Sequence, residues 1–272
     1  MQQFSVSPVQ MIRSLWVYRG LILTSIRREV AGKYSGSYMG VLWAFINPLL
    51  MLAVYTFVFS IIFQARWGEG TGSKSEFALV LFSGLIVFNL FSECINRAPG
   101  LIVSNKNYVK KVVYPLEILS WVGLGVSLFH TVISLLVWFL AYAVFFGVPH
   151  VTVLYLPLVL LPLILLIMGL SWVICSIAVY VRDVDQFVGI ATTVLLFLSP
   201  IFYPVASIPE KYRSMIYLNP LTPVIEQVRD VLYWGVYPDF KLLALYIFAT
   251  ALVAVIGFCW FQKTRKGFAD VL

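Results

Sequence analysis

Three groups of residues in the sequence have the types needed for chemistry: a glycine-rich stretch, two histidines and three cysteines. The stretch GEGTGSKS (68–75) has the composition of a phosphate-binding loop. That motif needs Gly, Lys and Ser in contiguous positions, so that backbone amides and the lysine surround the same phosphates. Here Ser73 separates Gly72 from Lys74. We therefore interpret residues 68–75 as a flexible loop, and we do not expect this chain to hydrolyse a nucleotide by itself.

The two histidines, His130 and His150, have no carboxylate nearby in the sequence, which gives no support for a Ser-His-Asp set. His130 falls near the middle of an apolar stretch, where an ionisable residue is by default a functional candidate. We expect a neutral imidazole there, hydrogen-bonded to a neighbouring hydroxyl such as Ser127, Thr131 or Ser134. One histidine by itself cannot form a metal site.

The cysteines Cys94, Cys175 and Cys259 lie in or beside different apolar segments and have no CxxC spacing. This pattern predicts neither a disulfide framework nor a zinc site. We expect all three to be small buried apolar residues. The sequence therefore predicts no metal and no cofactor bound to this chain.

The elements that position these residues must be membrane-spanning helices. Hydrophobic residues make up 61% of the chain and charged residues 11%, whereas globular proteins have about a quarter charged. Apolar windows of roughly 18 or more residues can cross a hydrocarbon core about 30 Å thick. The sequence predicts an all-α integral membrane protein with six transmembrane helices, at about 41–63, 77–93, 117–146, 151–181, 186–204 and 241–262.

The chain is expected to form a single domain, residues 1–272. Residues 1–40 would be cytoplasmic or interfacial, 41–262 would form the six-span bundle, and 263–272 would be a cytoplasmic tail. The segments 117–146 and 151–181 are longer than a bilayer needs, so we expect tilt, interfacial extension or a kink at Pro157 and Pro162. Most of the 19 lysines and arginines fall in the connections on the side that holds both termini. Because cytoplasmic connections carry excess Lys and Arg, both termini should be cytoplasmic.

Two segments outside the spans are predicted to lie at the membrane surface. Met11, Leu15, Tyr18, Ile22 and Ile26 recur at helical spacing, which predicts an amphipathic interfacial helix with its apolar side at the acyl boundary. The stretch 210–239 is too polar to span and is divided by Asn219, Pro220 and Pro223. This pattern favours a re-entrant helix pair between the fifth and sixth spans, with a plain extracellular loop as the alternative.

The six expected spans contain no acidic or basic residue in their apolar cores, which disfavours a proton or sodium relay. An external energy source is therefore needed. The connection VSNKNYVKKVVYPLEI (103–118) is cationic and aromatic. A short helix there could dock into a soluble partner, with Tyr108 as anchor and Lys106, Lys110 and Lys111 at a polar rim. Alternatively, the lysines only obey the positive-inside rule and bind anionic lipid.

The sequence resembles, over nearly its whole length, the ABC-2 type permeases that export lipid-linked cell-surface polysaccharides. The resemblance rests on five motifs in the family's order: KYSGSYMGVLWAFINPLL (33–50), NYVKKVVYP (107–115) with Asn105, YVRDVDQ (180–186), LSPIFYP (198–204) and LNPLTPVIEQVRD (218–230). The sequence departs from the pattern at Met39, where the family more often has Leu, and at Arg265, where it more often has an acid. Any one motif would be weak evidence, but five in order are specific.

The resemblance implies a bacterial inner-membrane permease that works as a homodimer with two copies of a separate ATPase subunit. ATP and Mg²⁺ would be bound by that partner and not by this chain. Closure of the ATPase pair would reach the spans through cytoplasmic segments. The implied coupling residues are Asn105, Tyr108, Lys110, Lys111, Arg182 and Asp183. For Arg182 and Asp183, a self-contained salt bridge or helix cap is the alternative.

The resemblance also places the first span, the fifth span and the re-entrant pair along the substrate path. The candidate path residues are Trp43, Tyr55, Phe59, Phe197, Ser199 and Tyr203, for which lipid or core contact is the alternative. Basic residues at the cytoplasmic entrance could pair with the pyrophosphate of a lipid carrier; they are Arg27, Arg28 and Lys33. The candidate outer gate comprises Asn219, Pro220, Glu226 and Arg229.

The sequence therefore predicts a transporter subunit that is not an enzyme and that moves a polyprenyl-pyrophosphate-linked polysaccharide, with O-antigen as the favoured cargo. Its expected partners are a second copy, the ATPase subunits, the glycolipid and membrane lipids, with no nucleic acid. The alternative is an integral membrane glycosyl- or acyltransferase, which would need clustered acids or a His-Asp pair at one membrane face. Asp183 and Asp185 come nearest to this requirement. An ion-driven flippase would need intramembrane charge.

Overall fold

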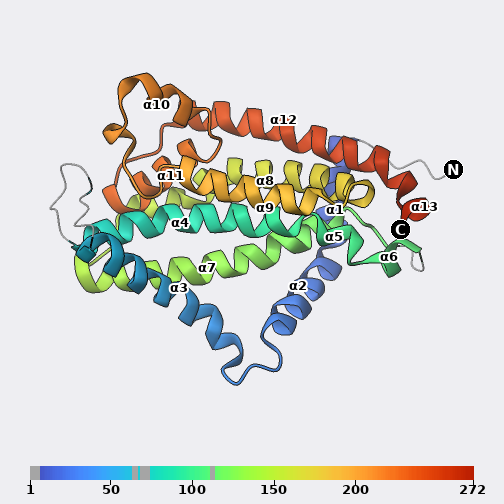
Figure 1. Ribbon diagram of the computed structural model, residues 1–272, viewed down its shortest axis with the longest axis horizontal. Coiled ribbons are helices and arrows are strands. Elements are labelled where there is room, and N and C mark those ends of the chain that lie inside the picture. The colour runs from blue at the N-terminus through green and yellow to red at the C-terminus, as the bar shows by residue number, and fades with distance from the viewer. Residues whose placement is uncertain (1–6, 63–66, 68–73, 111–113) are drawn as a thin grey trace.

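The computed structural model describes residues 7–62, 67, 74–110 and 114–272, and every regular element in this part of the chain is helical. Helices α4 (Lys74–Arg97), α7 (Ile118–Phe146), α8 (Leu156–Tyr180) and α12 (Phe240–Thr264) run along the long axis of the molecule (Figure 1). Helix α3 (Trp43–Tyr55) is inclined to them. Short 3-10 or π-helical turns extend three of them: Gly40–Leu42 and Thr56–Ile62 flank α3, Val151–Tyr155 precedes α8, and Arg265–Gly267 follows α12.

Five helical segments of the described chain are long and apolar enough to cross a bilayer: Gly40–Phe59, Ser75–Arg97, Ile118–Phe146, Val151–Tyr180 and Phe240–Val271. They correspond to the first four expected spans and the last. The all-helical membrane class is thus confirmed. Pro162 lies inside α8 without ending it, and Pro157 sits at the start of that helix, where its missing N–H costs nothing.

The expected fifth span, about 186–204, extends too far at its C-terminal end. The helix α9 begins at Val184 and ends at Leu198, so it has 15 residues. At about 1.5 Å per residue it covers roughly 22 Å, which is short of a full bilayer crossing. It ends because Ser199 is extended, with φ −84° and ψ 144°, and Pro200 cannot continue a regular helix.

The expected N-terminal helix is two helices, α1 (Pro8–Val17) and α2 (Arg19–Tyr34), which meet at Tyr18. The apolar residues of this segment were expected to lie at the acyl boundary of the membrane, but they contact other parts of the protein. Ile22 is buried against Ile118 and Val122 of α7, and Leu15, Tyr18 and Ile26 pack around the same contact. The expectation was wrong because helical spacing identifies an apolar face without identifying what covers it.

The two ends of the bundle carry different connecting elements (Figure 1). One end holds α1, α5 (Gly100–Val103), α6 (Lys106–Lys110) and α13 (Phe268–Val271), and we call it the α6 end. The other holds α10 (Glu210–Tyr217), α11 (Thr222–Arg229) and the π-helical turn Asp230–Trp234, and we call it the α10 end. The expected turn at 147–150 begins with Gly147 at φ +88°, a conformation that L side chains rarely adopt.

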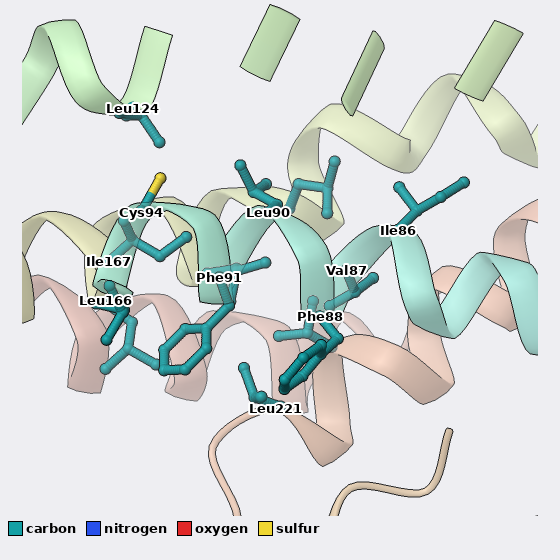
Figure 2. Packing of buried hydrophobic residues seen from close by; sticks show 14 of the residues in the cluster. Ile86, Val87, Phe88, Leu90, Phe91, Cys94, Leu124, Leu166, Ile167 and Leu221 are labelled. Carbon is teal, nitrogen blue, oxygen red and sulfur yellow. The ribbon is translucent and has the colours of Figure 1, made fainter. Parts of the chain in front are cut away.

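Helix α4 lies at the centre of the core. Figure 2 shows Phe88 and Phe91 of α4 directed towards α8 and Leu221, and Cys94 directed towards Leu124 of α7. Cys94 and Cys175 are buried, as expected, whereas Cys259 is only partly buried, so the expectation was wrong for that residue. No described group of His, Cys, Asp or Glu residues could hold a metal ion.

Helices α8 and α12 touch backbone to backbone. A Cβ atom added to Gly257 would lie 2.2 Å from the carbonyl oxygen of Gly169, and one added to Gly169 would lie 2.6 Å from that of Val253. Small residues allow such close crossings in membrane bundles, where dispersion contacts drive helix association. The two glycines therefore set the distance between α8 and α12.

Candidate functional site

A polar pocket of 350 Å³ lies between α2, α3, α4 and α7. It is lined by Lys33, Tyr34, Ala44, Asn47, Pro48, Met51, Tyr55, Phe82, Leu85, Asn89, Ser92, Glu93, His130 and Ser134. Lys33, Tyr55 and His130 are among the residues that the sequence singled out, and Ser134 was named as a partner of His130. The sequence assigned them to different roles, so it did not predict that they share a pocket.

The pocket exists because α4 carries a polar stripe on an otherwise apolar surface. Asn89, the pair Ser92 and Glu93, and the pair Asn96 and Arg97 recur at intervals of three or four residues, which puts them on one face of the helix. The first three line the pocket. Arg97 forms an ion pair with Glu29 of α2, and Asn96 Oδ1 accepts a hydrogen bond of 2.9 Å from Thr192 of α9. This spacing is visible in the sequence and was a signal for a shared polar face.

A charged cluster closes one side of the pocket. Nδ1 of His130 lies 2.8 Å from one carboxylate oxygen of Glu93 and 3.0 Å from the other. Lys33 Nζ lies 3.2 Å from the same carboxylate. The hydroxyl of Tyr34 lies 3.1 Å from Nε2 of His130. Helices α2, α4 and α7 therefore meet through a connected set of four polar side chains.

The expected partners of His130 were wrong. The Ser134 hydroxyl donates to the His130 backbone carbonyl at 3.0 Å, and Thr131 donates to the carbonyl of Ser127 at 2.9 Å. The imidazole itself pairs with Glu93, which is 37 residues earlier in the chain. An ionised carboxylate only accepts hydrogen bonds, so Nδ1 of His130 is the donor. The error arose because antiparallel α4 and α7 bring together residues that the sequence separates.

The Tyr34 hydroxyl remains protonated at this site. Burial raises the pKa of Tyr34 above its ordinary value, and the negative charge of Glu93 raises the pKa further. A protonated phenol can donate to Nε2 of His130 while Nδ1 donates to Glu93. This arrangement fixes the imidazole ring between α2 and α4.

The three basic residues expected at a lipid-pyrophosphate entrance do not gather into one site. Lys33 is engaged in the pocket by Glu93. Arg28 donates a hydrogen bond of 3.1 Å to the hydroxyl of Tyr108. Arg27 is exposed on α2. Of the three, Arg28 thus connects α2 to the cationic 103–118 connection.

The 103–118 connection contains the short helix α6 (Lys106–Lys110), where the sequence predicts a helix from Asn105. Tyr108 and Tyr114 stack with their ring centroids 4.4 Å apart. Lys106 and Lys110 are exposed, and Lys111 lies outside the described residues. The helix therefore presents its lysines outward while Tyr108 holds it against α2.

Arg182 and Asp183 lie just before α9, at the α6 end of the bundle, and both are exposed. The ion pairs of the described residues do not include one between them, and the Asp183 side chain makes no capping hydrogen bond to α9. The self-contained salt bridge and the helix cap are thus not seen in this part of the chain. Both side chains are available to a partner.

The C-terminal tail is attached to the same connection. Nη1 of Arg265 lies 2.5 Å from a carboxylate oxygen of Glu117, and Nη2 donates to the carbonyl of Tyr114 at 2.9 Å. The side chains of Arg265 and Glu117 are 11% and 7% exposed, so the pair is nearly dry. The indole of Trp172 donates to the Glu117 carbonyl at 3.3 Å. Arg265, which departs from the family pattern, therefore fixes the end of the 103–118 connection.

The aromatic path residues come together only in part. Phe59 stacks on Phe202 at 5.2 Å between ring centroids, and Tyr55 and Phe197 each approach Phe202 at 6.3 Å. Phe202 joins them although the sequence did not single it out. Trp43 is partly exposed at the start of α3 and does not belong to this aromatic group.

Ser199 and Tyr203 serve the local structure. Ser199 is fully buried, donates to the Leu195 carbonyl at 2.6 Å, and accepts a hydrogen bond of 2.9 Å from the Asn219 amide. The hydroxyl of Tyr203 donates to the Phe197 carbonyl at 3.1 Å. In this structure, Ser199 ties the end of α9 to the loop before α11 and does not line an open path.

The candidate gate residues hold α11 in the bundle. Asn219 Oδ1 accepts from the Leu221 backbone at 2.9 Å, and the Pro220 carbonyl accepts from Tyr246 of α12 at 2.8 Å. Burial raises the pKa of the Glu226 carboxyl above its ordinary value, while a hydrogen bond with Tyr217 and the charge of Arg229 oppose that shift. The two short helices divided near Asn219 and Pro220 are present as the sequence predicts.

Arg229 connects three segments through backbone carbonyls. Its Nε donates to Val80 of α4 at 3.1 Å, Nη1 donates to Pro200 at 2.6 Å, and Nη2 donates to Ile201 at 3.0 Å. Its guanidinium also lies 4.3 Å from the ring centroid of Trp67. Burial lowers the pKa of Arg229 to about 9, while the charges of Glu226 and Asp230 oppose the shift. Arg229 therefore connects α4, which also lines the pocket, to the residues that follow the end of α9.

The helices and their polar contacts define a multi-pass membrane protein. Residues 20–233 match the family described as ABC-2 type transporter. The match covers most of the chain, and the protein belongs to the ABC-2 type transporter family.

The chain is also similar to individual members of known role. It is 27% identical to the O-antigen export system permease protein RfbA of Myxococcus xanthus over 267 residues, covering 96% of this chain and 99% of that protein. It is 22% identical to RfbA of Klebsiella pneumoniae over 253 residues, covering 93% and 95%. It is 26% identical to the polysialic acid transport protein KpsM of Escherichia coli over 246 residues, covering 88% and 91%.

Proposed function

We propose that this chain is the membrane subunit of an ATP-driven exporter that moves a lipid-linked polysaccharide, with O-antigen as the favoured cargo, across a bacterial inner membrane. The observation that carries the proposal is the similarity to O-antigen export permeases over almost the full length of both chains. The similarity to a polysialic acid transporter supports the same cargo class, a surface glycan. The chain would be a transporter subunit and not an enzyme.

In this proposal the α6 end is cytoplasmic and receives the ATPase subunits. The exposed side chains of Lys110, Arg182 and Asp183 all belong to that end and suit a polar docking contact. Two copies of this chain would pair with two ATPase subunits, which would bind ATP and Mg²⁺. The glycolipid would pass between the two permeases.

A continuous set of contacts could carry the motion inward. Tyr108 of α6 bonds to Arg28 of α2, and the far end of α2 bonds through Lys33 and Tyr34 to Glu93 and His130. A displacement of α6 by the ATPase would therefore shift α2 against α4 and α7. In this proposal, α2 transmits the movement of the docking segment, α6 (Lys106–Lys110), to the polar pocket.

The finer topology belongs to the same proposal. The short helix α9, together with the extended residues after Leu198, would form the fifth of six crossings, and α10 with α11 would enter from the outer side without crossing. Single cysteines at Lys211 and Lys266 would test this, since both residues are exposed, at opposite ends of the bundle. A membrane-impermeant maleimide applied to spheroplasts should label Lys211→Cys and spare Lys266→Cys. Labelling in the opposite sense would refute the orientation.

The function is tested by deleting the gene in its host and measuring surface polysaccharide. Deletion should abolish the surface glycan and leave its lipid-linked form inside the cell, and the wild-type chain should restore export. Lys110→Glu should reduce export and copurification with the ATPase, because it reverses charge at the docking segment. The matched control is Lys241→Glu, also exposed but at the α10 end. Equal export by the two variants would contradict docking at α6.

A further inference from the structure

We propose that the pocket between α2, α3, α4 and α7 binds a sugar unit of the exported glycan, an inference that rests on the proposed function and adds a binding site to it. The pocket lies beside spanning helices, and polar groups at such positions must face protein or water because lipid cannot satisfy them. Its polar face is therefore part of a hydrated space inside the assembly.

The pocket contains unused hydrogen-bonding capacity. Asn47 of α3 and Asn89 of α4 are both exposed there, and within the described chain neither side-chain amide has a hydrogen-bond partner. Each amide offers two donors and one acceptor oxygen. Ser134 donates to its own helix at 3.0 Å and still offers lone pairs towards the pocket. A ligand here must therefore supply both donors and acceptors.

The charges in the pocket favour a neutral ligand. Glu93 is balanced by Lys33 at 3.2 Å and receives Nδ1 of His130 at 2.8 Å. A phosphate would be repelled by the carboxylate and would have to displace it from the lysine. Hydroxyl groups, in contrast, can donate to Glu93 and accept from the two asparagine amides. Many neutral hydroxyls on one ligand are the chemistry of a carbohydrate.

The shape of the pocket agrees with this chemistry. The aromatic side chain of Tyr55 lines the pocket, and such a ring offers an apolar face for the C–H surface of a sugar. The volume of 350 Å³ falls in the range of about 300–1,000 Å³ that is usual for small-molecule sites. The site therefore has space for a short piece of the glycan and not for the whole chain.

Photocrosslinking in cells tests the site directly. A p-benzoylphenylalanine would replace Asn89, and in a control chain it would replace Leu252, which is exposed near the middle of α12. After irradiation and denaturing purification, glycan is detected on the chain by periodate oxidation and hydrazide labelling. We expect a glycan adduct from position 89 and none from position 252. Absence of an adduct at position 89 in cells that still export, or equal adducts at both positions, would overturn the sugar site and leave the proposed function standing.

A second measurement separates binding from structural damage. The purified permease–ATPase complex in nanodiscs would be titrated with the host's lipid-linked glycan while ATP hydrolysis is followed. Asn89→Leu should raise the concentration for half-maximal stimulation by up to about tenfold and retain the maximal rate, because one or two hydrogen bonds to the sugar are lost. Asn89→Gln, which keeps the amide, should recover most of the affinity. An unchanged half-maximal concentration in Asn89→Leu would refute the site. If the wild-type complex shows no stimulation at any glycolipid concentration, the proposed function fails and the site with it.

Discussion

The substitution Arg229→Lys tests how the α10 end of the bundle is held together. Arg229 donates to the carbonyls of Val80, Pro200 and Ile201 from three different nitrogen atoms, and the residue is 4% exposed. A lysine keeps the positive charge but has a single nitrogen, so it can occupy only one of the three donor positions. About two hydrogen bonds to a charged group are therefore lost.

The expected cost follows from these lost bonds. A hydrogen bond to a charged group contributes about 1.5–3 kcal/mol, and water cannot replace the lost donors at a buried site. We expect Arg229→Lys to lower the free energy of unfolding by about 3 kcal/mol or more. In a protein of this size, 3 kcal/mol corresponds to a fall in Tm of about 6–12 °C.

Thermal unfolding of the detergent-purified protein, followed by tryptophan fluorescence, measures the effect. The matched control is Arg213→Lys in the neighbouring helix α10. Arg213 also donates to backbone carbonyls, those of Ile208 and Ala206, both at 2.9 Å, but it is only partly buried. Water can replace its lost donors, so the control should change stability by less than about 1 kcal/mol. Equal Tm values for the two variants would refute the assignment of Arg229 as a buried connection.

Two other contacts can be tested by the same thermal assay. Gly257→Ala should destabilise the protein by about 1–3 kcal/mol, because the new methyl group would meet the Gly169 backbone. The control Gly189→Ala on α9 adds a methyl group with no atom within 4 Å, so it should be neutral or stabilising. Destabilisation by both variants would point to a general intolerance of alanine. Glu117→Gln and Arg265→Gln should each cost about 3–5 kcal/mol by leaving a buried charge unpaired, and the double variant should cost much less than their sum. Simple additivity would show that the pair is not coupled.

The helical bundle could be predicted from the sequence because membrane insertion depends on a property of contiguous residues. Uninterrupted apolar runs such as those of α7 and α8 need no knowledge of their neighbours. The end of α9 was missed for a related reason. Residues up to Pro204 continue the apolar composition, but the proline ring at Pro200 ends the helix at Leu198, and hydropathy does not register backbone geometry.

The polar pocket could not be predicted in the same way because its contacts join distant parts of the chain. Glu93 and His130 meet only when α4 and α7 pack antiparallel, and Lys33 reaches them only through the placement of α2. Arg229 illustrates the same limit. The resemblance suggested a gate residue, but nothing in the sequence indicated that Arg229 is buried and donates to a carbonyl of α4. Residue type indicates the available chemistry, but packing decides where that chemistry is used.

The most direct test of the account is reconstitution of the purified chain in proteoliposomes, with and without the ATPase subunit from the same host, followed by an assay for movement of the lipid-linked glycan between leaflets. We expect movement only when both proteins and ATP are present, and none when a proton gradient is the sole energy source. Movement by this chain alone, driven by a proton gradient and unaffected by ATP, would contradict the central claim that a separate ATPase powers it.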